Sequence, residues 1–133
     1  MDFKKLSDQY RDELLNNVLP FWLQNSQDKE FGGYFTCLDR EGKVFDTDKF
    51  IWLQGREVWM FSMLYNKVEK RQEWLDCAVQ GGEFLKKYGH DGNYNWYFSL
   101  DRSGRPLVEP YNIFSYTFAT MAFGQLSLAT GNQ

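Results

Sequence analysis

Tyr34-Phe-Thr-Cys-Leu-Asp-Arg-Glu-Gly-Lys43 is repeated later in the chain, with one residue deleted, as Tyr97-Phe-Ser-Leu-Asp-Arg-Ser-Gly-Arg105. The offset is 63 residues at the first pair (34 to 97) and 62 at the last pair (43 to 105). Residues on both sides match in the same register, as Phe21 with Phe84 and Phe61 with Phe123. Any two helix–hairpin–helix units look somewhat alike, but a motif that recurs in register with both flanks favours a true internal repeat.

Each repeat unit, about residues 3–66 and about 67–130, is predicted to contain an amphipathic helix, a β-hairpin and a buried helix. Pro20 is expected to end or kink the first helix, and Thr47 or Asp48 to cap the helix that follows the first hairpin. Gly131 is expected to stop the last helix. The predicted elements are helices at 3–25, 47–66, 72–88 and 110–129, and hairpins at 31–45 and 96–108.

The helix over residues 50–64 is apolar nearly all round, and neighbouring units must cover it because a single unit cannot. The architecture that closes on itself with outer and inner helices in alternation is the all-α (α/α)6 toroid, here with short β-hairpin insertions. Six units would need roughly 380 residues. We therefore expect residues 1–133 to be the N-terminal part, about two of six units, of one toroid domain.

Composition excludes several classes of protein. A net charge of −3 gives no electrostatic footprint for nucleic acid or an anionic membrane. No secretory signal or membrane-spanning run is present, and two cysteines suit a reducing compartment, so we expect a cytoplasmic protein. The 12 Phe, 8 Tyr and 5 Trp are many rings for a short chain, which indicates that they belong to a larger interior or to a ring-lined cleft.

Arg56 is the most informative polar residue. Helical spacing puts it on one face with Trp52 and Trp59, in the middle of the apolar helix. A buried guanidinium needs a carboxylate, a ligand or water beside it. Arg56 is therefore interpreted either as a donor that orients a sugar between two indole rings, or as half of a structural ion pair or a side chain that reaches water. The helix by itself leaves these alternatives even.

Other candidates have weaker support. His90 follows an outer helix in a polar turn, which favours a solvated loop residue over a catalytic base. Glu57 is a possible acid or base, but pairing with Lys or Arg is its more ordinary role. The remaining candidates are two packing thiols, Cys37 and Cys77, and the repeated turn pairs Asp39-Arg40 and Asp101-Arg102. No phosphate loop, metal-ligand cluster or nucleophile motif is present, and no general acid–base pair can be assembled.

The sequence resembles the N-acylglucosamine 2-epimerase family over the whole chain. The most specific stretch is Lys49-Phe-Ile-Trp-Leu-Gln-Gly-Arg-Glu-Val-Trp59, preceded by Phe31-Gly-Gly-Tyr-Phe. The resemblance implies an (α/α)6 barrel and interconversion of N-acyl-D-glucosamine and N-acyl-D-mannosamine through an enediolate. It also implies a small-molecule amino sugar substrate, a homodimer, no required cofactor, and ATP as an activator rather than a reactant.

The resemblance also implies that Arg56 is an active-site residue that binds a substrate oxygen. It places the acid–base pair on two histidines of later helices, which His90 does not match, so these residues alone are expected to be inactive. Repeat geometry suggests four cavity walls, for each of which core packing is the alternative: Trp52, Trp59, Tyr111 and Phe114. Other functions remain open, namely an epimerase or isomerase of unmodified sugars (cellobiose 2-epimerase or mannose isomerase type) or a carbohydrate-binding module without activity.

Overall fold

A computed structural model describes residues 1–110 and 113–132. The order of helix, hairpin and helix occurs twice, as the repeat predicts. The first set comprises α1 (Phe3–Glu13), the π-helical turn η1 (Leu14–Val18), α2 (Leu19–Asn25), β1 (Cys37–Leu38), β2 (Val44–Asp46), β3 (Lys49–Phe50) and α3 (Ile51–Lys67). The second set comprises α4 (Gln72–Tyr88), β4 (Ser99–Leu100), β5 (Pro106–Val108) and α5 (Phe114–Thr130).

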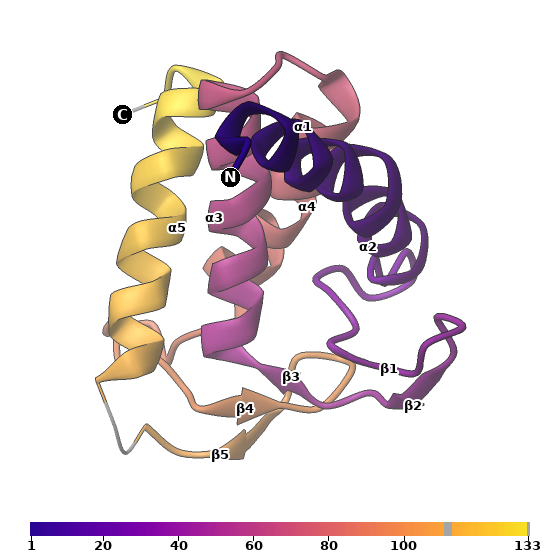
Figure 1. The fold of residues 1–133 in the computed structure, drawn as a ribbon. Coiled ribbons are helices and arrows are strands. Elements are labelled where there is room, and N and C mark those ends of the chain that lie inside the picture. Colours follow the sequence, from indigo (N-terminus) through magenta and orange to yellow (C-terminus); the bar gives the residue numbers. More distant parts are fainter. Residues whose placement is uncertain (111–112, 133) are drawn as a thin grey trace.

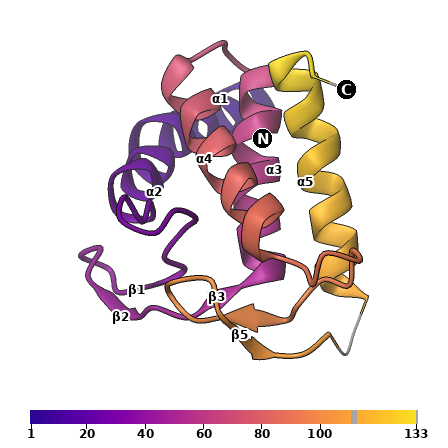
Figure 2. The same cartoon turned by 180° about the vertical axis from the view of Figure 1, so that it is seen from behind.

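Helix α3 is the central element. It runs parallel to α5, and α4 runs antiparallel to it (Figures 1 and 2). Helix α4 lies behind α3 and α5 in Figure 1 and in front of them in Figure 2. The core lies among these helices, with Val58 and Phe61 of α3 and Trp74 and Leu85 of α4 fully buried. The strands gather at the end where α3 and α5 begin (Figure 1), where β3, β4 and β5 form one antiparallel sheet and β1 and β2 another.

Tyr34 connects the first hairpin to two helices. The Gln54 side chain accepts a hydrogen bond from the Tyr34 N–H and donates one to its carbonyl, both at 2.8 Å. The Tyr34 hydroxyl donates to the carbonyl of Cys77 at 2.7 Å. One amide thus satisfies both backbone groups of this fully buried residue, which also forms an isolated β-bridge with Gln27.

Pro20 does not end the helical run, so of the two predicted outcomes, an end or a kink, the first is wrong. The helical run continues from α1 to α2 through the π-helical turn η1, in which the Leu19 N–H donates to the carbonyl of Leu14. Pro20 has no N–H, and its ring crowds the carbonyl four residues earlier. One wider turn just before the proline accommodates that crowding without a break.

The starts of α3 and α5 also differ from the sequence prediction. Neither Thr47 nor Asp48 caps α3, because both precede β3, which pairs with β4 and leads directly into the helix with Phe50 as its N-cap. The Ile51 N–H donates to the carbonyl of Phe98 at 3.0 Å. Helix α5 begins at Phe114 rather than near Pro110. The predicted stop at Gly131 is confirmed, since this residue has a φ of +73° and its N–H closes the helix on Ser127.

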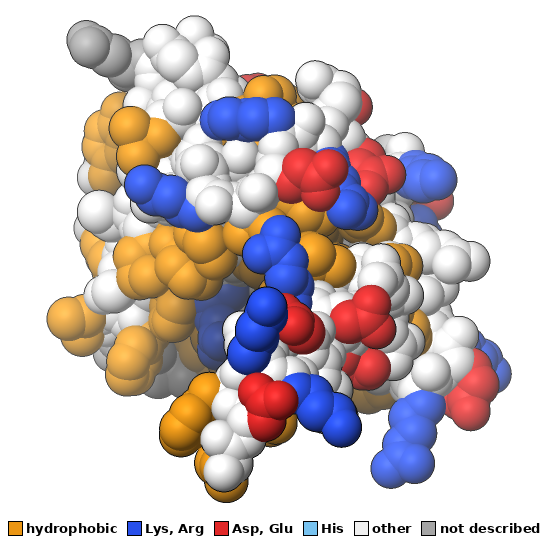
Figure 3. Space-filling model, turned by 45° about the horizontal axis from the view of Figure 1, so that its top comes forward, with side chains coloured by type: hydrophobic (Ala, Val, Ile, Leu, Met, Phe, Trp, Pro, Cys, Tyr) orange, Lys and Arg blue, Asp and Glu red, His pale blue; other side chains and the backbone are white. Residues whose placement is uncertain are grey.

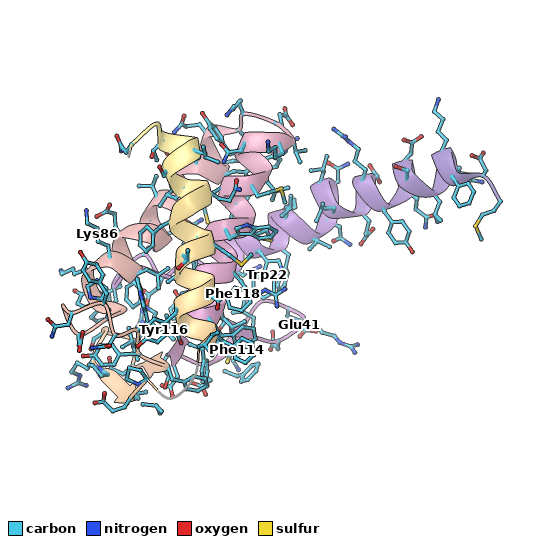
Figure 4. The ribbon with its side chains drawn as sticks, turned by 90° about the vertical axis from the view of Figure 1, so that its left-hand side faces the viewer. Trp22, Glu41, Lys86, Phe114, Tyr116 and Phe118 are labelled. Atoms are coloured by element: carbon cyan, nitrogen blue, oxygen red, sulfur yellow. The ribbon has the colours of Figure 1, made fainter. Side chains whose placement is uncertain are left out.

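Two helices present apolar side chains outside the core. Helix α1 extends away from the bundle (Figure 4) and has no buried residue. Helix α5 buries only Ser115, Ala119 and Ala122, and hydrophobic side chains gather on its side of the molecule (Figure 3). Within the described residues, no helix combines the length and the apolarity that crossing a membrane requires.

Candidate functional site

A cavity of about 310 Å³ lies between α3, the end of α2 and the segment before β1. We call it the Arg56 cavity. Five of its lining residues come from two successive turns of α3, so this helix supplies most of the walls. Its lining residues are Trp22, Thr36, Leu53, Arg56, Glu57, Trp59 and Met60.

Arg56 is exposed, which agrees with the alternative in which its side chain reaches water. Trp52 and Trp59, which share its face of α3, are half-buried. The Arg56 guanidinium carbon lies 6.0 Å from the Trp52 ring and 5.8 Å from the ring of Phe118, which comes from α5 (Figure 4). Within residues 1–110 and 113–132, Arg56 makes no ion pair or hydrogen bond. Its donors therefore remain available to a ligand in the cavity.

Of the four residues predicted to form cavity walls, the structure places one, Trp59, in the lining of the Arg56 cavity. Trp59 lines the Arg56 cavity as predicted, whereas Trp52 stacks near Arg56 from outside the lining. The two rings nearest the guanidinium are thus an indole and Phe118, not two indoles. Phe114 is 62% exposed at the start of α5 and does not line this cavity, and Tyr111 lies outside the described residues. Sequence reasoning missed Trp22 and Thr36, because only the fold brings α2 against α3.

Glu57 has no cationic partner among the described residues, contrary to the ion pair expected from sequence. Its side chain points toward α2, where its carboxyl oxygen lies 2.5 Å from the hydroxyl of the fully buried Ser26. Glu57 is only 7% exposed. Burial raises its pKa to about 8.

A second polar cluster holds the hairpins in place. Asp28 forms ion pairs with Lys49 at 3.0 Å and with Arg102 at 2.9 Å. The Lys49 ammonium also donates to the carbonyls of Gly32 and Arg102. Burial acts to raise the pKa of Asp28, but the hydrogen bonds from Arg102 and Lys49 outweigh it and hold the pKa at about 2. The cluster therefore joins the loop before β1 to both β3 and the β4–β5 turn.

The turn residues behave as predicted in part. Asp39 accepts backbone N–H bonds from Glu41 and Lys43, which confirms its role in the turn. Asp101 does the same for Ser103 and Arg105. Arg102 does not form a local pair, because its guanidinium reaches Asp28 across 74 positions of sequence. The repeated Asp-Arg pair drew attention to Arg102, but the sequence pattern did not predict that its partner is Asp28.

His90 lies apart from Arg56. It lines a larger cavity of about 530 Å³ between α4, α5 and the loop that joins α4 to β4. Its Nδ1 accepts from the Gly92 N–H at 3.0 Å, and its ring stacks on Tyr94 and meets the edge of Trp96. Among the described residues, no arginine lines the larger cavity, whose lining contains Lys86 and Glu83. Cys37 and Cys77 are free thiols, and burial raises the pKa of Cys77.

Comparison with known proteins decides the family. Residues 33–133 match the N-acylglucosamine 2-epimerase (GlcNAc 2-epimerase) family. The chain belongs to this family. It is 47% identical over 121 residues to N-acylglucosamine 2-epimerase of Mus musculus and 46% identical over 121 residues to that of Homo sapiens. Each alignment covers 88% of this chain, which spans only 29% and 28% of the length of those relatives.

Solved epimerase structures share the fold of this family member. Cellobiose 2-epimerase from Bacillus thermoamylovorans superposes with a TM-score of 0.88 at 29% identity, over 98% of this chain and 34% of that one. A D-mannose isomerase with a TM-score of 0.64 and 19% identity resembles it in fold alone. These matches confirm the predicted class, a part of an (α/α)6 toroid with short hairpins.

Proposed function

We propose that this chain is the arginine-bearing part of a sugar 2-epimerase that interconverts N-acyl-D-glucosamine and N-acyl-D-mannosamine. The observation that carries the proposal is Arg56, which stands exposed and unpaired within the described residues, in a cavity walled by Trp22 and Trp59. The relatives that share 46–47% identity with this chain are named N-acylglucosamine 2-epimerases, which supports the substrate.

The proposed chemistry takes place on the open-chain sugar. A base removes the proton on C2, the electron pair moves onto the carbonyl oxygen to form an enediolate, and a proton returned to the opposite face of C2 gives the epimer. Arg56 donates N–H bonds to the oxygen on which negative charge develops, and a fixed cation of this kind stabilises the transition state strongly. The indole faces of Trp22 and Trp59 contact the C–H face of the sugar.

The acid–base pair is not assigned to this chain. The family resemblance implies two histidines, and the sequence holds one, His90, which lies in the other cavity. Epimerisation by these residues alone is therefore not expected. The remaining expectations come from the resemblance and are also proposals, namely a homodimer, a cytoplasmic location, no required cofactor and activation by ATP, for which we assign no residues of this chain.

Epimerisation of unmodified sugars is the second candidate. Cellobiose 2-epimerases are also relatives, at 26% identity for Bacteroides fragilis and 28% for Dictyoglomus turgidum, and the structure of the Bacillus thermoamylovorans enzyme matches this fold. The same enediolate chemistry would serve both substrates. The higher identity to the N-acylglucosamine enzymes favours the first candidate.

A chimera tests the proposal. Residues 1–133 replace the matching segment of the mouse N-acylglucosamine 2-epimerase, and formation of N-acylmannosamine is measured, with cellobiose as the competing substrate. We expect the chimera to epimerise N-acylglucosamine. Arg56→Met should lower kcat by at least about 100-fold, because one donor to a developing oxyanion contributes about 3 kcal/mol, and Arg56→Lys should recover part of the loss.

The matched control is Arg40→Met, which removes an exposed arginine from the β1–β2 turn. It should leave kcat unchanged. A kcat of Arg56→Met within about threefold of the unsubstituted chimera would show that Arg56 has no catalytic role. Preferred turnover of cellobiose would favour the second candidate.

A further inference from the structure

The hydrogen bonds of Ser26 determine the protonation of Glu57. The Ser26 hydroxyl oxygen lies 2.6 Å from the carbonyl oxygen of Trp22 and 2.5 Å from a carboxyl oxygen of Glu57. A carbonyl oxygen only accepts, so the single hydroxyl proton belongs to the bond with Trp22, the usual bond of a helical serine to the carbonyl four residues earlier. A neutral Glu57 carboxyl group that donates to the Ser26 hydroxyl oxygen accounts for the second contact.

The surroundings of Glu57 agree with a neutral acid. The groups that couple to it electrostatically are Tyr34, from the segment before β1, and Cys77, from α4. Both are acids whose pKa burial raises, so neither supplies a positive charge. Arg56 is adjacent on α3 itself but forms no ion pair with Glu57. Within the described residues, desolvation is thus unopposed by any cation, and the raised pKa of Glu57 has the same cause.

The protonation of Glu57 matters for Arg56. These two are the ionisable residues in the lining of the Arg56 cavity. An ionised carboxylate there would attract the guanidinium and cancel its charge. We propose that Glu57 is a positioning residue, a neutral acid anchored on Ser26 that leaves the Arg56 guanidinium unpaired for a ligand oxygen with developing negative charge. The ligand part of this inference rests on the proposed function, whereas the protonation state does not.

Infrared spectroscopy of the 133-residue chain tests the protonation directly. A carboxylic acid has a C=O stretching band that a carboxylate lacks. We expect this band at about pH 6 and its loss as the pH rises through about 8. Glu57→Gln should lack the band, and Ser26→Ala should shift it because the carboxyl loses its acceptor. The matched control Glu41→Gln removes an exposed carboxyl from the β1–β2 turn (Figure 4) and should leave the band unchanged.

The outcome that overturns the proposal is a wild-type spectrum without a titrating carboxylic acid band, or a band that Glu57→Gln retains. The pH titration of the wild-type chain needs no substitution, so a variant that fails to fold does not remove the test. A shift in Ser26→Ala identifies the anchor, and an unshifted band would show that Ser26 does not accept the proton.

A pH profile of the chimera tests the consequence for Arg56. We expect kcat/KM to fall about tenfold between about pH 7 and 9, as Glu57 ionises and pairs with Arg56. Glu57→Gln keeps a neutral donor toward Ser26, so the kcat/KM of this variant should not fall at alkaline pH. If Glu57 had only a structural role, the substitution would leave that fall unchanged. A fall that persists in Glu57→Gln overturns the link to Arg56. An inactive chimera contradicts the proposed function instead, and the infrared result is independent of it.

Discussion

Asp28 shows at the scale of one residue how a buried charge is tolerated. Asp28 and Lys49 are both fully buried, and each has the other as a partner. Lys49 finds three acceptors for its three N–H groups, in Asp28, Gly32 and Arg102. Arg102 adds two donors to the two oxygens of Asp28. Because the charges and the hydrogen bonds are satisfied together, the cluster specifies how the hairpins meet rather than only adding stability.

We predict that Asp28→Asn lowers the free energy of unfolding by about 3–5 kcal/mol at neutral pH, because Lys49 is left buried without a counter-charge. The folded-state pKa of Asp28 is about 2, below the usual 3.8, so its contribution is complete above about pH 4 and is lost as the pH falls through about 2. The difference between the two proteins should therefore shrink by roughly 2 kcal/mol over that range.

Urea unfolding followed by circular dichroism at about pH 7, 4 and 2 measures this difference. Asp8→Asn, in the exposed helix α1, is the matched control and should follow the wild type at each pH. A constant difference between Asp28→Asn and the wild type across the three conditions would contradict the ion-pair account of the cluster.

At the scale of elements, the glycines of α4 and α5 differ in how closely other side chains approach them. Gly81 lies on α4, and a Cβ built there would stand 2.1 Å from the Tyr34 hydroxyl oxygen. Tyr34 cannot move aside, because Gln54 and Cys77 bind its backbone and its hydroxyl. Gly124 on α5 is the opposite case, since a Cβ there meets nothing within 4 Å.

We predict opposite effects for the same substitution in the two helices. Gly81→Ala should destabilise the chain by about 1–3 kcal/mol, because the overpacking against Tyr34 exceeds the gain in helix propensity. Gly124→Ala should stabilise it by up to about 1 kcal/mol, since only the propensity changes. Thermal unfolding of both variants is the measurement, and a stabilised Gly81→Ala would show that Tyr34 is not held as tightly as described.

At the scale of the whole molecule, α5 has the apolar composition of a buried helix, but several of its apolar side chains are exposed. Its exposed apolar side chains include Leu128, at 69%, and Met121, at 39%. A helix that is hydrophobic on all sides is normally covered by protein. Soluble monomers rarely show such a contiguous apolar surface, so the face indicates contact with further protein.

We predict that the 133-residue chain associates with itself as its concentration rises, because association covers this face. Sedimentation velocity should show a mass that increases with concentration, and the double variant Met121→Ser, Leu128→Ser should show a smaller increase. Phe45→Ser, which removes one apolar side chain exposed on β2, is the control. A wild-type chain that stays monomeric at all concentrations would contradict the prediction.

Most of the elements followed from sequence because their signals are local. Helical spacing predicted α4 at its observed bounds, Gln72–Tyr88, and the repeated turn motif predicted both hairpins. The start of α3 did not follow, because its first N–H is bonded by Phe98 of the other hairpin rather than by a neighbouring side chain. The continuation of the helical run past Pro20 did not follow either, since a π-helical turn is a backbone adjustment with no sequence marker of its own.

In the candidate site, too, some features followed from the sequence and others only from the packing of separate elements. The sequence by itself determined the repeat and the family and indicated Arg56 as a candidate, because those depend on residue order and on spacing along one helix. Only the tertiary structure decided that Arg56 is exposed beside Phe118, that Glu57 meets Ser26 across 31 positions, and that Arg102 meets Asp28 across 74. The physical reason is that helical periodicity tells which side chains share a face, whereas the partner of that face is set by how separate elements pack.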